Sequence, residues 1–202
     1  MKILQGFLMV MGGLAILAVV ALITGYVLAL LTPDMRASMR PVVLSSEAVD
    51  TFNGKLDGLK KEVLSANTAN VQRNISLTVT EEEINSVLVM MLAEGTFPAK
   101  EMLVNFNDGF LLVYTAWSFP ALPAKSVLMG TMSTENGKPK FIIMDFMLGK
   151  LPLPGNFDSS VENLLNVLIK LNAPLEGMKV NIKDITVSDG QIKITGATTT
   201  TK

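Results

Sequence analysis

Residues 102–119 read MLVNFNDGFLLVYTAWSF and contain two strand-like runs joined by a turn. In the first run Met102, Val104 and Phe106 recur at every second position, and the run ends at Asn107. The second run begins at Phe110, after Asp108-Gly109. An Asp-Gly pair between two such runs is a strong short-range signal for a β-hairpin. The stretch therefore predicts two antiparallel strands.

The same turn signal occurs twice more along the chain. Asn136-Gly137 separates the strand-like runs of residues 126–134 and 140–148, and Asp189-Gly190 lies between two alternating runs near the C-terminus. Short turns of this kind join antiparallel neighbours, whereas parallel strands need longer connections. The three turns together predict an antiparallel meander.

Three other segments bear on the extent of the sheet. Residues 75–79 alternate and predict a short strand. Residues 149–155 contain two prolines, which exclude a central strand there because proline cannot donate a backbone hydrogen bond. Residues 197–202 are mostly threonine and predict a frayed tail.

Three amphipathic helices are predicted in the same part of the chain. Apolar side chains recur at helical spacing over residues 49–63, 84–92 and 161–169. A polar connection is expected at residues 65–74. The fold class that follows is α+β, with a curved antiparallel sheet packed on or wrapped around amphipathic helices.

The second of these helices has a clear start signal. Thr80 and Glu83 have the spacing of a capping box. The three glutamates of residues 81–83 also raise a metal or acid-base interpretation. Acidic side chains in a first turn, however, complement the positive end of the helix dipole, and no partner ligands follow them.

The N-terminal segment carries no charged residue from Ile3 to Leu31. This run is longer than the roughly 20 residues that cross a bilayer and than the roughly 7–15 apolar residues of a cleaved signal peptide. The charges on its two sides are nearly balanced and leave the orientation open. We expect a transmembrane signal anchor, a juxtamembrane linker, an α+β domain and a flexible tail at residues 1–32, 33–40, 41–196 and 197–202.

Composition excludes several classes of function. The chain has no cysteine and no histidine, which removes thiolate and imidazole metal ligands and any Ser-His-Asp triad. Its formal net charge is −1, so it offers no basic field for nucleic acid. Phosphate-binding and dinucleotide-binding glycine motifs are absent. We therefore expect no catalytic residues, no metal, no cofactor and no enzymatic activity.

The middle strands are apolar on both faces. Successive strand residues point to opposite faces, yet residues 110–114 and 141–144 are apolar throughout. Such strands need cover on both faces, from helices, a curved sheet, a partner protein or an apolar ligand. The methionines in these strands suit either a variable apolar cavity or an ordinary core. The predicted lining of an apolar groove is Trp117, Phe119, Met129, Met144 and Phe146.

Two of these aromatic residues have a further interpretation. Trp117 and Phe119 end the second strand of the opening stretch, just before Pro120. They fit either a packed edge of the core or a rim that touches lipid at the bilayer interface, where tryptophan is favoured.

The order of elements resembles a known family. Residues 77–85 (LTVTEEEIN) and 149–154 (GKLPLP), with the anchor before them, resemble the YpmS-like family of bacterial membrane-anchored proteins. The arrangement is also similar to tubular lipid-binding (BPI-like) domains, where a curved sheet wraps a long helix. The resemblance implies a domain on the extracytoplasmic side of the cell membrane and supplies no catalytic residues. The chain departs from it after Pro174, where the expected aromatic residues are missing.

Two hypotheses for function follow. The first is a non-catalytic, single-pass membrane protein whose extracytoplasmic domain binds or chaperones a lipid or another apolar ligand. The second is a structural or assembly subunit of a membrane complex, with partner chains covering the apolar faces. The expected partners are the bilayer, a lipid or a membrane protein, and not nucleic acid.

Overall fold

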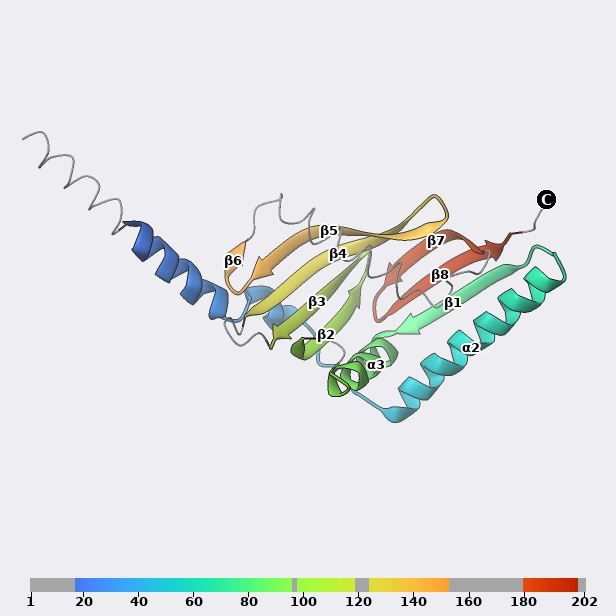
Figure 1. Cartoon of the computed structure of the whole chain (residues 1–202), viewed down its shortest axis with the longest axis horizontal. Helices are drawn as coiled ribbons and strands as arrows, with labels where there is room; N and C mark the ends of the chain where they lie inside the picture. The colour runs from blue at the N-terminus through green and yellow to red at the C-terminus, as the bar shows by residue number, and fades with distance from the viewer. Residues whose placement is uncertain (1–16, 96–97, 119–123, 153–179, 200–202) are drawn as a thin grey trace, which may run out of the picture.

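The computed structural model describes residues 17–95, 98–118, 124–152 and 180–199 (Figure 1). Its fold is α+β, with a long apolar helix near the N-terminus and two antiparallel sheets packed with helices. The five-stranded sheet has the order β2-β3-β4-β5-β6, and the three-stranded sheet has the order β1-β8-β7. The predicted fold class is therefore confirmed.

The strands of the larger sheet, β2 to β6, are consecutive in the chain; β1 precedes them, and β7 and β8 follow them, in the smaller sheet. Residues 17–30 are helical and are followed by the 3₁₀-helix η1. The further elements are α2 (Ser46–Thr68), β1 (Asn74–Thr80), α3 (Glu81–Ala93), β2 (Ala99–Asn107), β3 (Phe110–Trp117), β4 (Lys125–Glu135), β5 (Lys138–Leu148), β6 (Leu151–Pro152), β7 (Val180–Ser188) and β8 (Gln191–Thr198), with η1 at Asp34–Ser38.

All three predicted hairpins are present. The turn glycines Gly109, Gly137 and Gly190 have φ angles of 83°, 73° and 75°, which glycine adopts without steric cost. They join β2 to β3, β4 to β5 and β7 to β8. The local turn chemistry of the sequence thus set the pairing of six strands.

The two sheets share one hydrophobic core. The five-stranded sheet contributes five buried side chains and the three-stranded sheet contributes four: Val104, Phe106, Leu111, Leu128 and Phe141, with Val79, Ile185, Val187 and Ile192. Partly buried side chains of α2 and α3 pack against this core, among them Phe52 and Leu88. One face of the larger sheet is thereby covered.

The opposite face of the five-stranded sheet is covered by the chain around η1. Leu112, Tyr114 and Val127 form a second buried cluster with Met39, and Met35 packs against it. Leu111 and Leu112 therefore belong to different clusters, as expected for adjacent strand residues. The apolar character of both faces is explained by two separate cores.

Several segments differ from the sequence-based expectation. The helix expected to end before Ser65 runs to Thr68, because Ala66 is fully buried. The strand expected to fray at residue 197 continues to Thr198, whose hydroxyl accepts a hydrogen bond from Arg73 N at 2.9 Å. The predicted linker 33–40 contains η1 and the buried Met39. The predicted helix 161–169 lies outside the described residues.

Two other local predictions are confirmed. Thr80 and Glu83 form the capping box, with Glu83 N donating to Thr80 Oγ1 at 3.2 Å and Thr80 N donating to Glu83 Oε2 at 3.0 Å. The proline-containing segment supplies β6, a two-residue strand at the edge of its sheet. An edge position accommodates proline because one side needs no hydrogen-bond donor.

Candidate functional site

The predicted ligand-binding residues lie at different places in the fold. Met129 packs on the Leu112 cluster, whereas Phe146 packs on the core between the sheets. These side chains are on opposite faces of the five-stranded sheet, so they do not line one groove. Phe119 lies outside the described residues.

Met144 and Trp117 occupy two further positions. Asp145 pairs with Met129 and Ile143 pairs with Gly130, which leaves Met144 as the extra residue of a β-bulge. Its side chain is 55% exposed. Trp117 ends β3, and its indole Nε1 donates a hydrogen bond to Ser126 Oγ at 2.9 Å.

A groove is present elsewhere, between the start of α2 and the outer surface of α3. It has a volume of about 510 Å³ and is lined by Leu44, Ser45, Ser46, Val49, Asp50, Ser86, Val89, Met90 and Ala93. The groove is closer to an open surface than to an enclosed cavity. The lining surface is mostly apolar, so the groove offers a hydrophobic contact area.

Two of the polar residues that line the groove, Ser45 and Ser86, are hydrogen-bonded within the protein. Ser45 N donates to Ser86 Oγ at 3.1 Å, and Ser45 Oγ donates to Glu82 Oε1 at 2.8 Å. Ser45 Oγ also accepts from Ala48 N at 3.1 Å and thereby caps α2. The groove therefore offers apolar contact, with Ser46 and the carboxylate of Asp50 as the other polar groups of its lining.

The pattern of burial on α3 departs from that of an ordinary surface helix, although Ile84 and Leu88 pack against the core between the sheets. Its buried residues are the polar Glu83, Asn85 and Ser86, whereas Val89 and Met90 are each 42% exposed. Surface helices usually turn the apolar stripe inward. Met91, placed by the sequence pattern in the buried stripe, is exposed as well. Helical periodicity did not find this surface because every residue from 87 to 93 is apolar.

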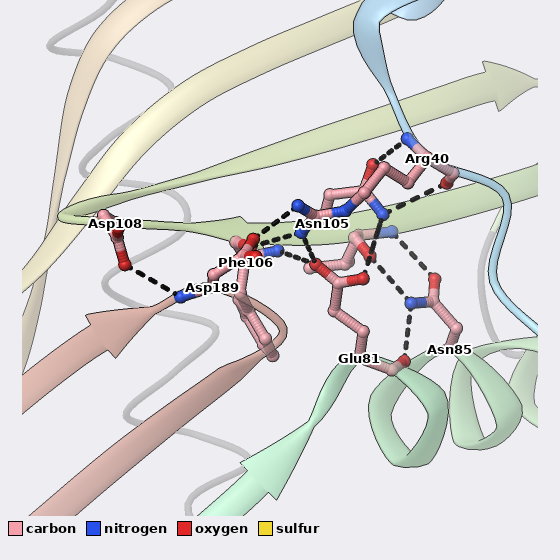
Figure 2. A network of polar contacts seen from close by, with 8 residues as sticks. Arg40, Glu81, Asn85, Asn105, Phe106, Asp108 and Asp189 are labelled. Atoms are coloured by element: carbon pink, nitrogen blue, oxygen red, sulfur yellow. Dashed lines mark hydrogen bonds and ion pairs between the residues drawn. The ribbon is translucent and has the colours of Figure 1, made fainter.

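The inward polar residues of α3 hold the outer edge of β2 (Figure 2). Asn85 Oδ1 accepts from Val104 N at 2.8 Å, and Asn85 Nδ2 donates to Val104 O at 2.7 Å. Glu81 Oε1 accepts from Phe106 N at 2.5 Å. Edge strands present unpaired backbone groups, and α3 satisfies them with side chains.

Arg40 joins the segment after η1 to the same edge. Its guanidinium donates to Glu81 Oε1 and to Phe106 O, each at 2.7 Å, and pairs with Asp189. Hydrogen bonds to Glu81 and Asp189 raise the pKa of Arg40 above its ordinary value. Asn105 adds two bonds to the Arg40 backbone, at 2.6 and 3.2 Å. This network fixes the position of α3 and therefore of the groove.

The described residues contain no cluster of three or more acidic side chains placed to hold a metal ion. Comparison with protein-family models, curated proteins and solved structures finds no match to this chain. The candidate site therefore rests on the groove and on the exposed apolar side chains of α3.

Proposed function

We propose that this chain is a non-catalytic, membrane-anchored protein whose extracytoplasmic domain binds the acyl part of a lipid in the groove between α2 and α3. The observation that carries the proposal is the outer surface of α3, which exposes Val89 and Met90 beside the groove while Asn85 is buried on the inner side. Exposing apolar side chains beside an apolar groove has a free-energy cost that a bound apolar ligand recovers.

The anchor supports a lipid over other apolar ligands. The stretch Leu17–Ser38 is long and apolar enough to cross a membrane. A protein held in a bilayer meets lipid at high local concentration, so even weak affinity gives occupancy. Methionine at the groove suits a chain of variable shape because its side chain is flexible.

Site-specific photo-crosslinking in membranes tests the proposed groove. A photoreactive amino acid replaces Met90 in one variant and Met144 in a matched control, since both methionines are exposed but only Met90 lines the groove. We expect lipid adducts at Met90 and few at Met144. Equal lipid labelling at the two positions contradicts the groove assignment.

An assembly function is the second candidate, because the apolar surface extends beyond the groove. Val43 is 77% exposed, and Met91 is exposed next to Met90. The same crosslinking experiment separates the two functions. A stoichiometric protein adduct at Met90, without lipid, favours a subunit of a membrane complex.

The extracytoplasmic location is tested with an introduced cysteine. The chain has no native cysteine, so Lys61→Cys on the exposed side of α2 provides a single label site. We expect a membrane-impermeant maleimide to label this variant in intact cells. Labelling only after lysis places the domain in the cytoplasm.

A further inference from the structure

We infer that the end of the five-stranded sheet nearest the apolar helix lies on the bilayer surface and binds anionic lipid headgroups. This inference rests on the membrane anchoring proposed above. We call this end the anchor-side rim; its described residues are Arg36, Lys100, Trp117, Lys125, Lys150 and Leu151.

The apolar helix is fastened directly to the rim. Lys150 N donates a hydrogen bond to Leu28 O near the end of the helix, at 2.8 Å. Gly149, between β5 and β6, has φ of 62°, and a Cβ there would lie 2.1 Å from Leu28 O. A Cβ on Gly25 would lie 3.8 Å from Leu151 Cδ1. Helix and sheet therefore meet by backbone contact, without a free linker (Figure 1).

Side chains strengthen the same junction. Lys150 Nζ lies 2.8 Å from Asp34 Oδ1, and Lys125 Nζ donates to Thr32 Oγ1 at 2.9 Å. Pro33, which lies between Thr32 and Asp34 in the sequence, is fully buried. The rim is consequently held at a fixed height along the helix axis.

That height corresponds to the headgroup layer. The uncharged run from Ile3 to Leu31 exceeds the roughly 20 residues that cross the hydrocarbon core, so its last turns extend to the membrane surface. Tyr26 is 50% exposed in this part of the helix, and tyrosine is enriched at membrane interfaces. The contacts of Gly25 and Leu28 with residues 149–151 place the rim at the level of Tyr26.

The charge of the rim is complementary to anionic lipid. The described basic residues of the rim lie in η1, at the starts of β2 and β4, and in the turn between β5 and β6: Arg36, Lys100, Lys125 and Lys150. The described acidic residues there are Asp34 and Glu101. Glu101 pairs with Arg36 at 3.5 Å. The described residues of the rim have four basic and two acidic side chains, a positive excess, although the whole chain has a net charge of −1. Basic side chains beside a membrane segment attract anionic headgroups.

The fluorescence of Trp117 provides a test of the contact between the anchor-side rim and the bilayer. It is the single tryptophan of the chain and lies at the rim end of β3. The full chain is reconstituted in phosphatidylcholine vesicles that carry a nitroxide quencher at a shallow or a deep acyl position. We expect the shallow quencher to reduce Trp117 fluorescence several-fold more than the deep one. Fluorescence unaffected by either quencher overturns the rim contact.

Headgroup preference is measured with shallow quenchers on phosphatidylglycerol or phosphatidylcholine at equal mole fraction. We expect stronger quenching by the anionic lipid, and a smaller difference in high salt because exposed charges are screened. Lys100→Gln reduces the difference, whereas Lys61→Gln on the exposed side of α2 leaves it unchanged. Equal quenching by both lipids refutes the anionic preference.

Carbonate extraction of the same vesicles separates this inference from the proposed anchoring. Protein removed by carbonate shows that the anchoring proposal is wrong. Protein that stays in the membrane with unquenched Trp117 shows that only the rim contact is wrong.

Discussion

Asn85 of α3 pairs with Val104 of β2 as a neighbouring strand would. The side-chain amide accepts from Val104 N at 2.8 Å and donates to Val104 O at 2.7 Å, and the residue is 1% exposed. A third bond, from Asn85 Nδ2 to Glu81 O at 2.7 Å, fixes the amide within its own helix. One side chain thus closes a sheet edge and orients the helix that carries the groove.

Asn85→Ala is expected to destabilise the protein by about 3 kcal/mol, because it leaves a buried backbone donor and acceptor unpaired. Asn67→Ala on α2 is the matched control, since Asn67 Oδ1 is buried without a hydrogen-bond partner among the described residues. Urea unfolding of the full chain in detergent, monitored by Trp117 fluorescence, measures the loss of stability in both variants. Equal losses for the two variants contradict the role given to Asn85.

Gly149→Ala is expected to open the junction between the apolar helix and the sheet. The new methyl group would overlap Leu28 O and Ala29 Cα, which a Cβ would approach to 2.1 and 2.6 Å. Gly109→Ala is the control because its φ is also positive, at 83°, but no atom lies within 4 Å of a Cβ there. Gly109→Ala therefore measures only the cost of placing a side chain at a positive φ angle, which is about 1 kcal/mol.

Two measurements decide the Gly149 prediction. We expect a larger fall in thermal stability for Gly149→Ala than for Gly109→Ala. We also expect faster proteolysis between the helix and the domain in the first variant only. Identical behaviour of the two variants shows that the contact with Leu28 and Ala29 contributes little.

The exposed apolar residues of α3 are expected to serve binding and not stability. Met90→Gln changes the free energy of unfolding by no more than about 0.5 kcal/mol, as is usual for surface sites. Leu88→Ala, on the face that packs against the core, costs about 2 kcal/mol or more. Native mass spectrometry of the full chain is expected to show less retained lipid for Met90→Gln. A marked loss of stability in that variant contradicts the surface role.

Tyr114 is expected to make the fold sensitive to alkaline pH. Burial raises the pKa of Tyr114, the negative charge of Glu101 raises it further, and Arg36 lowers it. The unfolded chain therefore releases this proton at lower pH than the folded chain. The contribution to stability is complete below the unfolded pKa of about 10 and is lost as pH rises above it.

Phenylalanine substitutions test this pH dependence. The chain has two tyrosines, so Tyr26→Phe in the apolar helix is the natural control for Tyr114→Phe. Denaturant unfolding between pH 9 and 11 is expected to show a shallower loss of stability for Tyr114→Phe than for the control. If the free energy of unfolding falls with pH in the same way for both variants, Tyr114 is not the source of the alkaline sensitivity.

The sequence by itself determined the local structure of this protein. Asp108-Gly109, Asn136-Gly137 and Asp189-Gly190 set three hairpins, since these turns need backbone conformations that few residues adopt. Thr80 and Glu83 set the start of α3 by capping it. These outcomes were predictable because each depends on residues close together in the chain.

Only the tertiary structure decided which apolar residues are covered. Met129 and Phe146 are both large apolar strand residues, but Phe146 pairs with Leu128, the neighbour of Met129, so the strand register places the two side chains on opposite faces. Asn85 is buried and Met90 is exposed because the edge of β2, distant in the chain, needs polar partners. Such long-range demands for hydrogen bonds override the local preference of apolar side chains for the interior, and no periodicity within α3 records them.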